Sequence, residues 1–166
     1  MKLTDIASLE KWMGFEKEIR AKSGLNAAVF DTKGMRITDY KEWANELCPV
    51  IKSNDNGQTF ICSLAHQNTS AQAMKAKKAI IEECDAGLVK LVVPIFVNDE
   101  FLGVAGGCGL LAEDGEVDPF LIHKTTGIDE EKLEALSENI ATIDKETLSA
   151  LSDFISKRLN EIIQER

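Results

Sequence analysis

The chain has 166 residues, of which 44% are hydrophobic and 28% charged, and its formal net charge is −9. This length and composition suit one soluble globular domain with a core of its own. The acidic balance opposes binding to nucleic acid or to an anionic membrane surface, so neither is expected as a partner. No apolar run is long enough to span a membrane and the N-terminus lacks the apolar stretch of a secretion signal, which predicts a cytoplasmic protein.

The N-terminal part of the chain predicts a helix followed by a β-hairpin. Apolar residues recur at helical spacing over residues 3–23, and Gly24 ends the pattern. The sequence DTKG at residues 31–34 is typical of a tight turn. We therefore expect strands near residues 25–30 and 35–39.

The middle of the chain predicts several helices and then a longer hairpin. Short helices are expected first, broken at Pro49 and again at residues 53–57. A clear helix follows over residues 68–84, which are rich in Ala, Lys and Glu. The apolar strand over residues 88–97 then turns into a second strand over residues 100–111.

The C-terminal part, residues 128–166, is expected to be helical. Its last helix carries an apolar stripe at spacings of three and four residues, formed by Leu148, Leu151, Ile155, Leu159 and Ile162. Such a stripe either docks on the domain or pairs with the same helix of a second copy, which would give a homodimer. Both alternatives stay open at the level of sequence.

Two hairpins with helices between them favour an α+β fold. We expect a single PAS-like domain over residues 1–166, with a core over about residues 24–111 and C-terminal helices over 128–166. A central antiparallel sheet would carry the intervening helices on one face, flanked by the N- and C-terminal helices. This plan describes architecture and does not by itself set function.

The second strand of the longer hairpin contains the run GGCG at residues 106–109. Glycine weakens a strand interior, because it loses more entropy on folding and has no side chain to pack. We therefore expect Gly106 and Gly107 to give room for a ligand or a helix that approaches the sheet, next to the thiol of Cys108.

The cysteines are the main candidates for chemistry, and they stand at Cys48, Cys62, Cys84 and Cys108. No C-x-x-C pair occurs, so zinc-ribbon and thioredoxin-type motifs are not supported. In a PAS-like fold the elements that carry these thiols surround an internal cavity, where they could converge as ligands of zinc or an iron–sulfur cluster. The alternative is that they are small, buried apolar residues.

His66 lies four residues after Cys62, so the two side chains could share a helical face. His66 is a candidate ligand contact, and the alternative is a histidine with an ordinary place in the core or on the surface. No G-x-S-x-G or H-E-x-x-H motif occurs, so no catalytic residue is assigned and an enzyme is not expected. A weaker alternative is a thiol-based enzyme with one low-pKa cysteine near His66.

Several segments resemble one known family. The stretch SGLNAAVFDTKGMRIT, the cysteine segments ELCPVIKS and NGQTFIC, and above all ECDAGLVKLVVPIFVNDEFLGVAGGCGLL are similar to those of the PocR sensory domain, a PAS-variant ligand-binding domain of bacterial and archaeal signalling proteins. The likeness runs from the first helix to about Leu111. The matching positions are Cys48, Cys62, Cys84, Gly87, Pro94, Gly103, Gly106 and Gly107.

The resemblance implies a small-molecule ligand and a signalling output protein as partners. Such domains are thought to sense small organic molecules, including short diols, and they are usually fused to a DNA-binding, kinase or cyclase output domain. No output domain is present in this chain. Asp85 stands where the family usually has His, and Cys108 stands where Gln is common, so a diol ligand does not carry over directly.

We favour a ligand-binding sensory module without catalytic activity, whose cavity is lined by the four cysteines and His66 and whose last helix transmits the bound state or dimerises. The alternative is a four-cysteine metal or iron–sulfur protein, acting as a redox or gas sensor or as an electron carrier. Its cofactor would be an iron–sulfur cluster or another thiolate-bound metal on Cys48, Cys62, Cys84 and Cys108.

Overall fold

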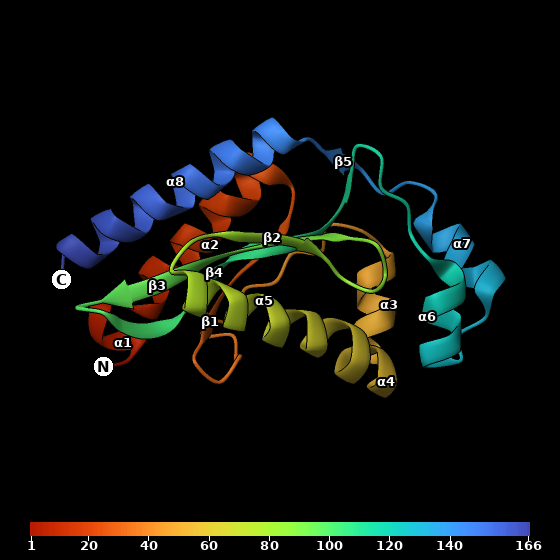
Figure 1. The fold of residues 1–166 in the computed structure, drawn as a ribbon, viewed down its shortest axis with the longest axis horizontal. Helices are drawn as coiled ribbons and strands as arrows, with labels where there is room; N and C mark the ends of the chain where they lie inside the picture. Colours follow the sequence, from red (N-terminus) through yellow and green to blue (C-terminus); the bar gives the residue numbers. More distant parts are fainter.

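An antiparallel ladder in the order β1–β4–β3–β2 forms the centre of the molecule (Figure 1). The computed structural model describes residues 1–166. The strands are β1 Asn26–Asp31, β2 Ile80–Glu83, β3 Val89–Val97, β4 Glu100–Ala112 and β5 Thr142–Ile143. The short β5 pairs in parallel with the end of β4. The structure is thus an α+β domain with a central, mostly antiparallel sheet, and this prediction is confirmed.

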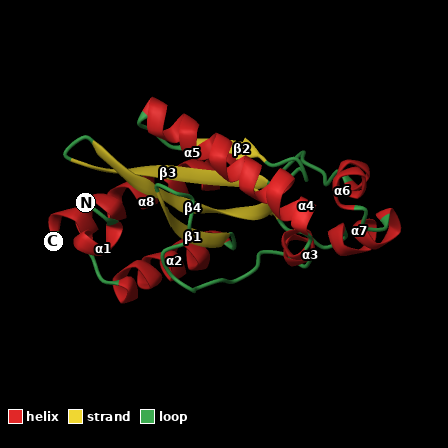
Figure 2. Ribbon diagram, turned by 90° about the horizontal axis from the view of Figure 1, so that it is seen from below, coloured by secondary structure: helices red, strands yellow, loops and turns green.

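Helices cover both faces of the sheet. They are α1 Leu3–Ile6, α2 Leu9–Ser23, α3 Leu47–Ser53, α4 Asp55–Gly57, the π-helix η1 Gln58–Ser63, α5 Leu64–Ala76, α6 Pro119–Thr126, α7 Glu130–Ser137 and α8 Lys145–Gln164. In Figure 1, α8 and α2 lie on one side of the strands and α5 on the other. Figure 2 looks from the α5 side and shows α3, α4, α6 and α7 gathered at one end.

The larger core lies between the sheet and the pair α2–α8. The apolar stripe of α8 consists of Leu148, Leu151, Ile155, Leu159 and Ile162, and all five are buried. They belong to one cluster with Trp12 and Phe15 of α2 and with Leu91 and Ile95 of β3. Of the two alternatives for the stripe, docking on the domain is therefore the one that the structure shows.

The opposite face of the sheet is covered less completely. Ala73 of α5 packs on Val92 and Val104. A separate cluster, formed by Leu47, Ile51, Ile61, Ala86, Leu88, Ile122 and Leu133, joins α3 and η1 to α6 and α7.

The prediction of a hairpin over residues 25–39 is wrong for its second strand. After β1 the chain makes the predicted turn, but only a single bridge pairs Phe30 with Arg36. Residues 37–46 then run as an irregular segment towards α3. The carboxylate of Asp31 accepts hydrogen bonds from the backbone N–H groups of Lys33 and Met35, so the turn forms without a strand after it.

The long central helix is also shorter than expected. It ends at Ala76, where Lys77 adopts a left-handed backbone conformation with φ 53°. Ile80 to Glu83 form the edge strand β2 instead and pair with β3. The β-branched residues Ile80 and Ile81 favour this extended conformation once β3 offers a partner.

The two ends of the chain lie together. The N-terminal ammonium group pairs with Glu100 at 3.2 Å, and Lys11 pairs with Glu165. Figure 1 shows both termini at the same end of the molecule. None of the helices has the length and apolar composition needed to cross a membrane.

Candidate functional site

A cavity of about 480 Å³ lies between the sheet and the helices α3, η1 and α5, and we call it the main cavity. The irregular segment after β1 forms part of its wall through Arg36 and Trp43. The structure brings five of the predicted site residues to this wall, namely Cys48, Cys62, His66, Cys84 and Cys108. They come from α3, η1, α5, the segment after β2, and β4.

A row of three side chains across the sheet contributes to the cavity wall. Asn26 of β1 is paired with Cys108 of β4, and Cys108 is paired with Lys90 of β3. Directly opposite residues of an antiparallel sheet project to the same face, so the three side chains lie next to one another. All three line the main cavity, and Phe30, four residues after Asn26, joins them on this face.

The helical wall carries a matching stripe. Gln58, Cys62 and His66 follow one another at intervals of four residues across η1 and α5, and all three line the main cavity. Gln58 donates a hydrogen bond to the hydroxyl of Ser63 at 3.0 Å. A π-helical turn is rare and occurs frequently at functional sites, because it changes which side chains face inward.

Three thiols of the main cavity, those of Cys48, Cys62 and Cys84, have raised pKa values. Burial raises the pKa of Cys48 and Cys84, and it raises the pKa of Cys62 to about 11. Repulsion from the other cysteines of the cavity is part of these raised pKa values at Cys48 and Cys62, because thiolates repel one another. A thiol-based enzyme with a low-pKa cysteine near His66 would need the opposite shift at Cys62.

The four-cysteine metal centre has no support in the side-chain geometry. All four cysteines are free thiols. No group of three or more His, Cys, Asp or Glu side chains lies close enough together to hold a metal ion. The thiols therefore share one cavity wall without converging on one point, as a tetrahedral zinc site or a cluster would require.

His66 is buried and neutral. Its ring lies 4.1 Å from the ring of Phe30, measured between centroids, and its Nε2 atom is 3.2 Å from the hydroxyl of Ser70. Burial, and then the nearby positive charges of Lys90 and Lys52, lower the pKa of His66 to about 3. Its Nδ1 atom has no hydrogen-bond partner.

The cations of this cavity were not predicted from the sequence. Arg36, Lys52 and Lys90 line it, and none of the three forms an ion pair. Nη1 of Arg36 donates to the carbonyl oxygen of Tyr40 at 3.1 Å. A lysine inside the otherwise apolar strand LVKLVVPIFV was the signal that could have revealed Lys90.

Buried polar atoms without a partner are concentrated at the same place. The structure has four such side-chain atoms, which are Asn26 Oδ1, Arg36 Nε, Gln58 Oε1 and His66 Nδ1. Every one of these residues lines the main cavity. Buried polar groups in native proteins are almost always hydrogen-bonded, so this clustering marks the cavity as the place where a partner is missing.

The glycines of β4 serve mainly the packing of the sheet. Gly106 and Gly107 do not line the main cavity. A Cβ atom on Gly106 would collide with the main chain of Leu91, and one on Gly107 would lie 2.8 Å from Cβ of Leu25. Gly109 does line the cavity, and its φ of +108° favours glycine.

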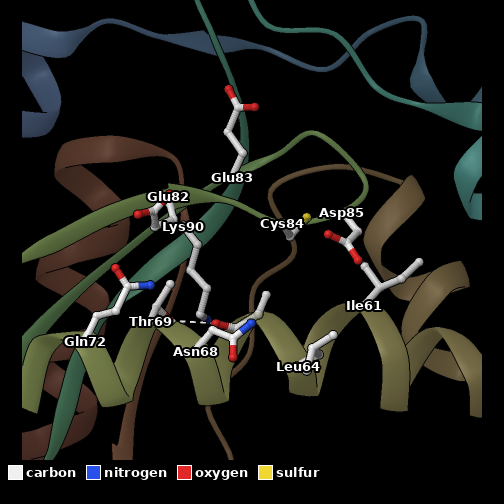
Figure 3. Close-up of a pocket in the computed structure, with 11 residues that line it drawn as sticks. Ile61, Leu64, Asn68, Thr69, Gln72, Glu82, Glu83, Cys84, Asp85 and Lys90 are labelled. Atoms are coloured by element: carbon white, nitrogen blue, oxygen red, sulfur yellow. Dashed lines mark hydrogen bonds between the residues drawn. The ribbon is translucent and has the colours of Figure 1, made fainter.

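A smaller cavity of about 180 Å³ lies on the other side of Lys90 and Cys84, which line both cavities (Figure 3). Figure 3 shows the Lys90 side chain reaching from β3 towards Asn68 and Thr69 of α5. The smaller cavity carries carboxylates, those of Glu82, Glu83 and Asp85. Asp85, which stands where His is usual, thus faces this cavity and is not part of the main one.

Comparison with models of protein families gives a match to the sensory domain found in PocR, over residues 5–166. The match includes the C-terminal helices, beyond Leu111 where the resemblance seen in the sequence became loose. Neither the curated proteins nor the solved structures contain a match. Because the family model covers essentially the whole chain, the protein belongs to the PocR sensory domain family.

Proposed function

We propose that this chain is a cytoplasmic sensory module, without catalytic activity, that binds a small organic molecule in the main cavity. The observation that carries this proposal is that all four residues with an unpartnered buried polar atom line this cavity. Each such group destabilises the empty protein by about 1–3 kcal/mol, and a ligand that supplies the missing partners would recover that energy on binding. The volume of about 480 Å³ is typical of small-molecule sites.

In this proposal the cysteines contribute surface to the site. Cysteine side chains are small, polarizable and weakly hydrogen-bonding, so Cys48, Cys62, Cys84 and Cys108 offer a soft apolar lining. His66, held neutral, offers a donor or an acceptor through Nδ1 according to its tautomer. Gly106 and Gly107 support the site indirectly, by letting β4 approach its neighbours closely.

The bound state would reach an output partner through the sheet. Lys90 and Cys108 face the main cavity from β3 and β4, while neighbouring residues of β3 such as Leu91 pack in the core with α8. A ligand that orders the cavity wall differently in two states of the domain shifts the balance between them. We propose that α8 presents this change to a signalling protein or to a second copy of the chain, and light scattering of the purified protein tests the homodimer.

A thermal-shift screen with a cavity-filling variant tests the binding site. The screen uses short alcohols, diols, amides and carboxylic acids, and we expect at least one class to raise the Tm in proportion to the logarithm of its concentration. Cys62→Phe fills the cavity and should remove that shift, whereas the matched variant Cys62→Ala keeps the room and should retain it. A shift that persists in Cys62→Phe, or a screen without any shift, contradicts the proposal.

A further inference from the structure

The main cavity has a charge opposite to that of the chain. Its wall contains five cationic residues, which are Lys33, Arg36, Lys41, Lys52 and Lys90, and no Asp or Glu. The chain as a whole has 28 acidic and 19 basic residues. The concentration of positive charge in one cavity of an acidic protein favours an anionic occupant.

No cation of the wall forms an ion pair within the protein. The ion pairs of the structure involve the N-terminus, Lys11, Arg20, Lys77 and Arg158, and none of the five cavity cations. The buried carboxylate of Glu16 lies near enough to act on Arg36. It is committed elsewhere, because it accepts hydrogen bonds from the N–H of Val29 and the hydroxyl of Thr38 and does not line the cavity.

The carboxylates of the smaller cavity do not change this balance. Glu82 is paired with Lys90 in the register of β2 and β3, yet the two side chains form no ion pair. Arg36 and Lys52 line only the main cavity. The carboxylates of the smaller cavity therefore do not compete with a ligand of the main cavity for these two cations.

Arg36 is held in place for binding before any ligand arrives. Its Nη1 atom is anchored on the carbonyl oxygen of Tyr40, and its guanidinium lies 5.5 Å from the centre of the Phe30 ring. Lys90 lies 5.5 Å from the centre of the same ring. Nε of Arg36 remains without a partner. A fixed guanidinium with a free donor binds an oxyanion with little loss of side-chain entropy.

The rest of the wall suits an organic body. Phe30, Met35, Trp43 and Leu88 give apolar surface, and the thiols add to it. The side-chain oxygens of Asn26 and Gln58 have no donor. An inorganic anion would leave the apolar wall unused, whereas an organic acid would cover both kinds of surface.

We infer that the ligand of the main cavity is a small organic anion, whose carboxylate or similar oxyanion group is held by Arg36, Lys52 and Lys90 and whose body packs on Phe30 and Trp43. This inference rests on the proposed function and names its ligand class. It differs from the short diols that the family resemblance implies, because five unpaired cations gain little from an uncharged ligand.

Matched pairs of ligands test the charge directly. Benzoate is compared with benzamide, and butanoate with butanamide, in titrations of the ¹⁵N-labelled protein at neutral pH and constant ionic strength. We expect each carboxylate to bind about tenfold more tightly than its amide, with resonance shifts at residues of the main cavity. The constant ionic strength keeps long-range screening equal in all titrations.

Variants of single cations then test whether the wall of the main cavity is what attracts the carboxylate. Lys52→Gln should reduce carboxylate affinity about fivefold or more and leave amide affinity unchanged. Lys52 forms no ion pair, so this variant is expected to fold, and Arg36→Gln provides a second test. Lys157→Gln, an exposed and unpaired cation of α8, is the matched control and should change nothing.

The outcomes separate the inference from the proposed function. Amides that bind the cavity as tightly as their carboxylates overturn the inference and leave the sensory module in place. A loss of carboxylate affinity in Lys157→Gln equal to that in Lys52→Gln also overturns it, because the attraction would then come from the overall field of the protein. Carboxylates and amides that all fail to shift cavity resonances at millimolar concentration overturn both.

Discussion

The side-chain amide of Asn45 donates a hydrogen bond to the carbonyl oxygen of Gly109 over 2.6 Å, and so ties the segment before α3 to the end of β4. The same side chain accepts a hydrogen bond from the backbone N–H of Cys48 at 2.7 Å. Asn45 therefore fixes the first turn of α3 against the sheet at the edge of the main cavity.

Asn45→Ala removes both of these hydrogen bonds and leaves buried partners behind. We expect the free energy of unfolding to fall by about 1–3 kcal/mol, measured by urea denaturation. Asn56→Ala is the matched control, since Asn56 is exposed, and it should change the free energy by less than about 0.5 kcal/mol. Equal effects of the two variants would show that the tie to Gly109 contributes nothing.

His66 should make the stability of the protein depend on pH. Its pKa is lowered from 6.5 to about 3 in the folded protein, so the unfolded chain binds a proton first as the pH falls. Stability is then lost progressively as the pH falls from about 6.5 towards 3, with a slope of up to about 1.4 kcal/mol per pH unit. Urea denaturation at several pH values measures this slope.

The variant His66→Gln isolates the contribution of this histidine. The carboxylates of the chain also titrate in acid, so the relevant quantity is the difference between the two proteins at each pH. We expect this difference to shift in favour of His66→Gln as the pH decreases from 6.5. Parallel pH profiles for the two proteins would contradict a buried, neutral His66.

Two glycines in different settings, Gly106 buried in β4 and Gly14 exposed on α2, should respond to alanine in opposite directions. Gly106→Ala places a methyl group into the main chain of Leu91, and we expect a loss of about 1–3 kcal/mol in the free energy of unfolding. Gly14→Ala in α2 meets open space, and we expect a gain of about 0.5–1 kcal/mol from helix propensity. Thermal unfolding of both variants measures these changes. A similar loss of stability in both variants would contradict the role of close strand packing at Gly106.

Cys62 should be chemically inert in the folded protein. Its pKa of about 11 lies two units above the ordinary value of 9.0, so the reactive thiolate at neutral pH is about a hundredfold scarcer than in the unfolded chain. We expect alkylation by iodoacetamide to be slower by about this factor, followed by mass spectrometry of the labelled peptides. The control is an exposed thiol introduced by Thr59→Cys. If Cys62 is alkylated as fast as this exposed thiol, the result contradicts the burial of Cys62.

The parts of the fold that sequence could predict are those set by local pattern. The stripe at Leu148 to Ile162 defined α8, and the turn at Asn98 and Asp99 defined the hairpin of β3 and β4, because periodicity and turn chemistry act over a few residues. The edge strand at Ile80 to Glu83 was not predicted, because it forms only when β3 lies beside it. Its sequence alone reads as the end of a helix.

The cysteines of the candidate site could be predicted from the sequence, and its cationic residues could not. The thiols drew attention through residue type and family resemblance. The cations did not, because a lysine such as Lys52 on a predicted helix is most often solvated. Only the packing of α3, η1 and the segment around Arg36 over one sheet face brings these charges together. The assignment of Gly106 and Gly107 to a ligand missed the nearer reason, which is the close approach of neighbouring strands.

The meeting of the two chain ends has a practical consequence for protein engineering. The N-terminal ammonium group contacts Glu100 and Lys11 contacts Glu165, at the end of the molecule away from α3, α6 and α7 (Figure 1). A short linker can join such termini, and new termini can be opened at the exposed turn near Glu113 and Asp114. The resulting circular permutant keeps the main cavity intact and places a fluorescent reporter directly beside the strand that carries Cys108.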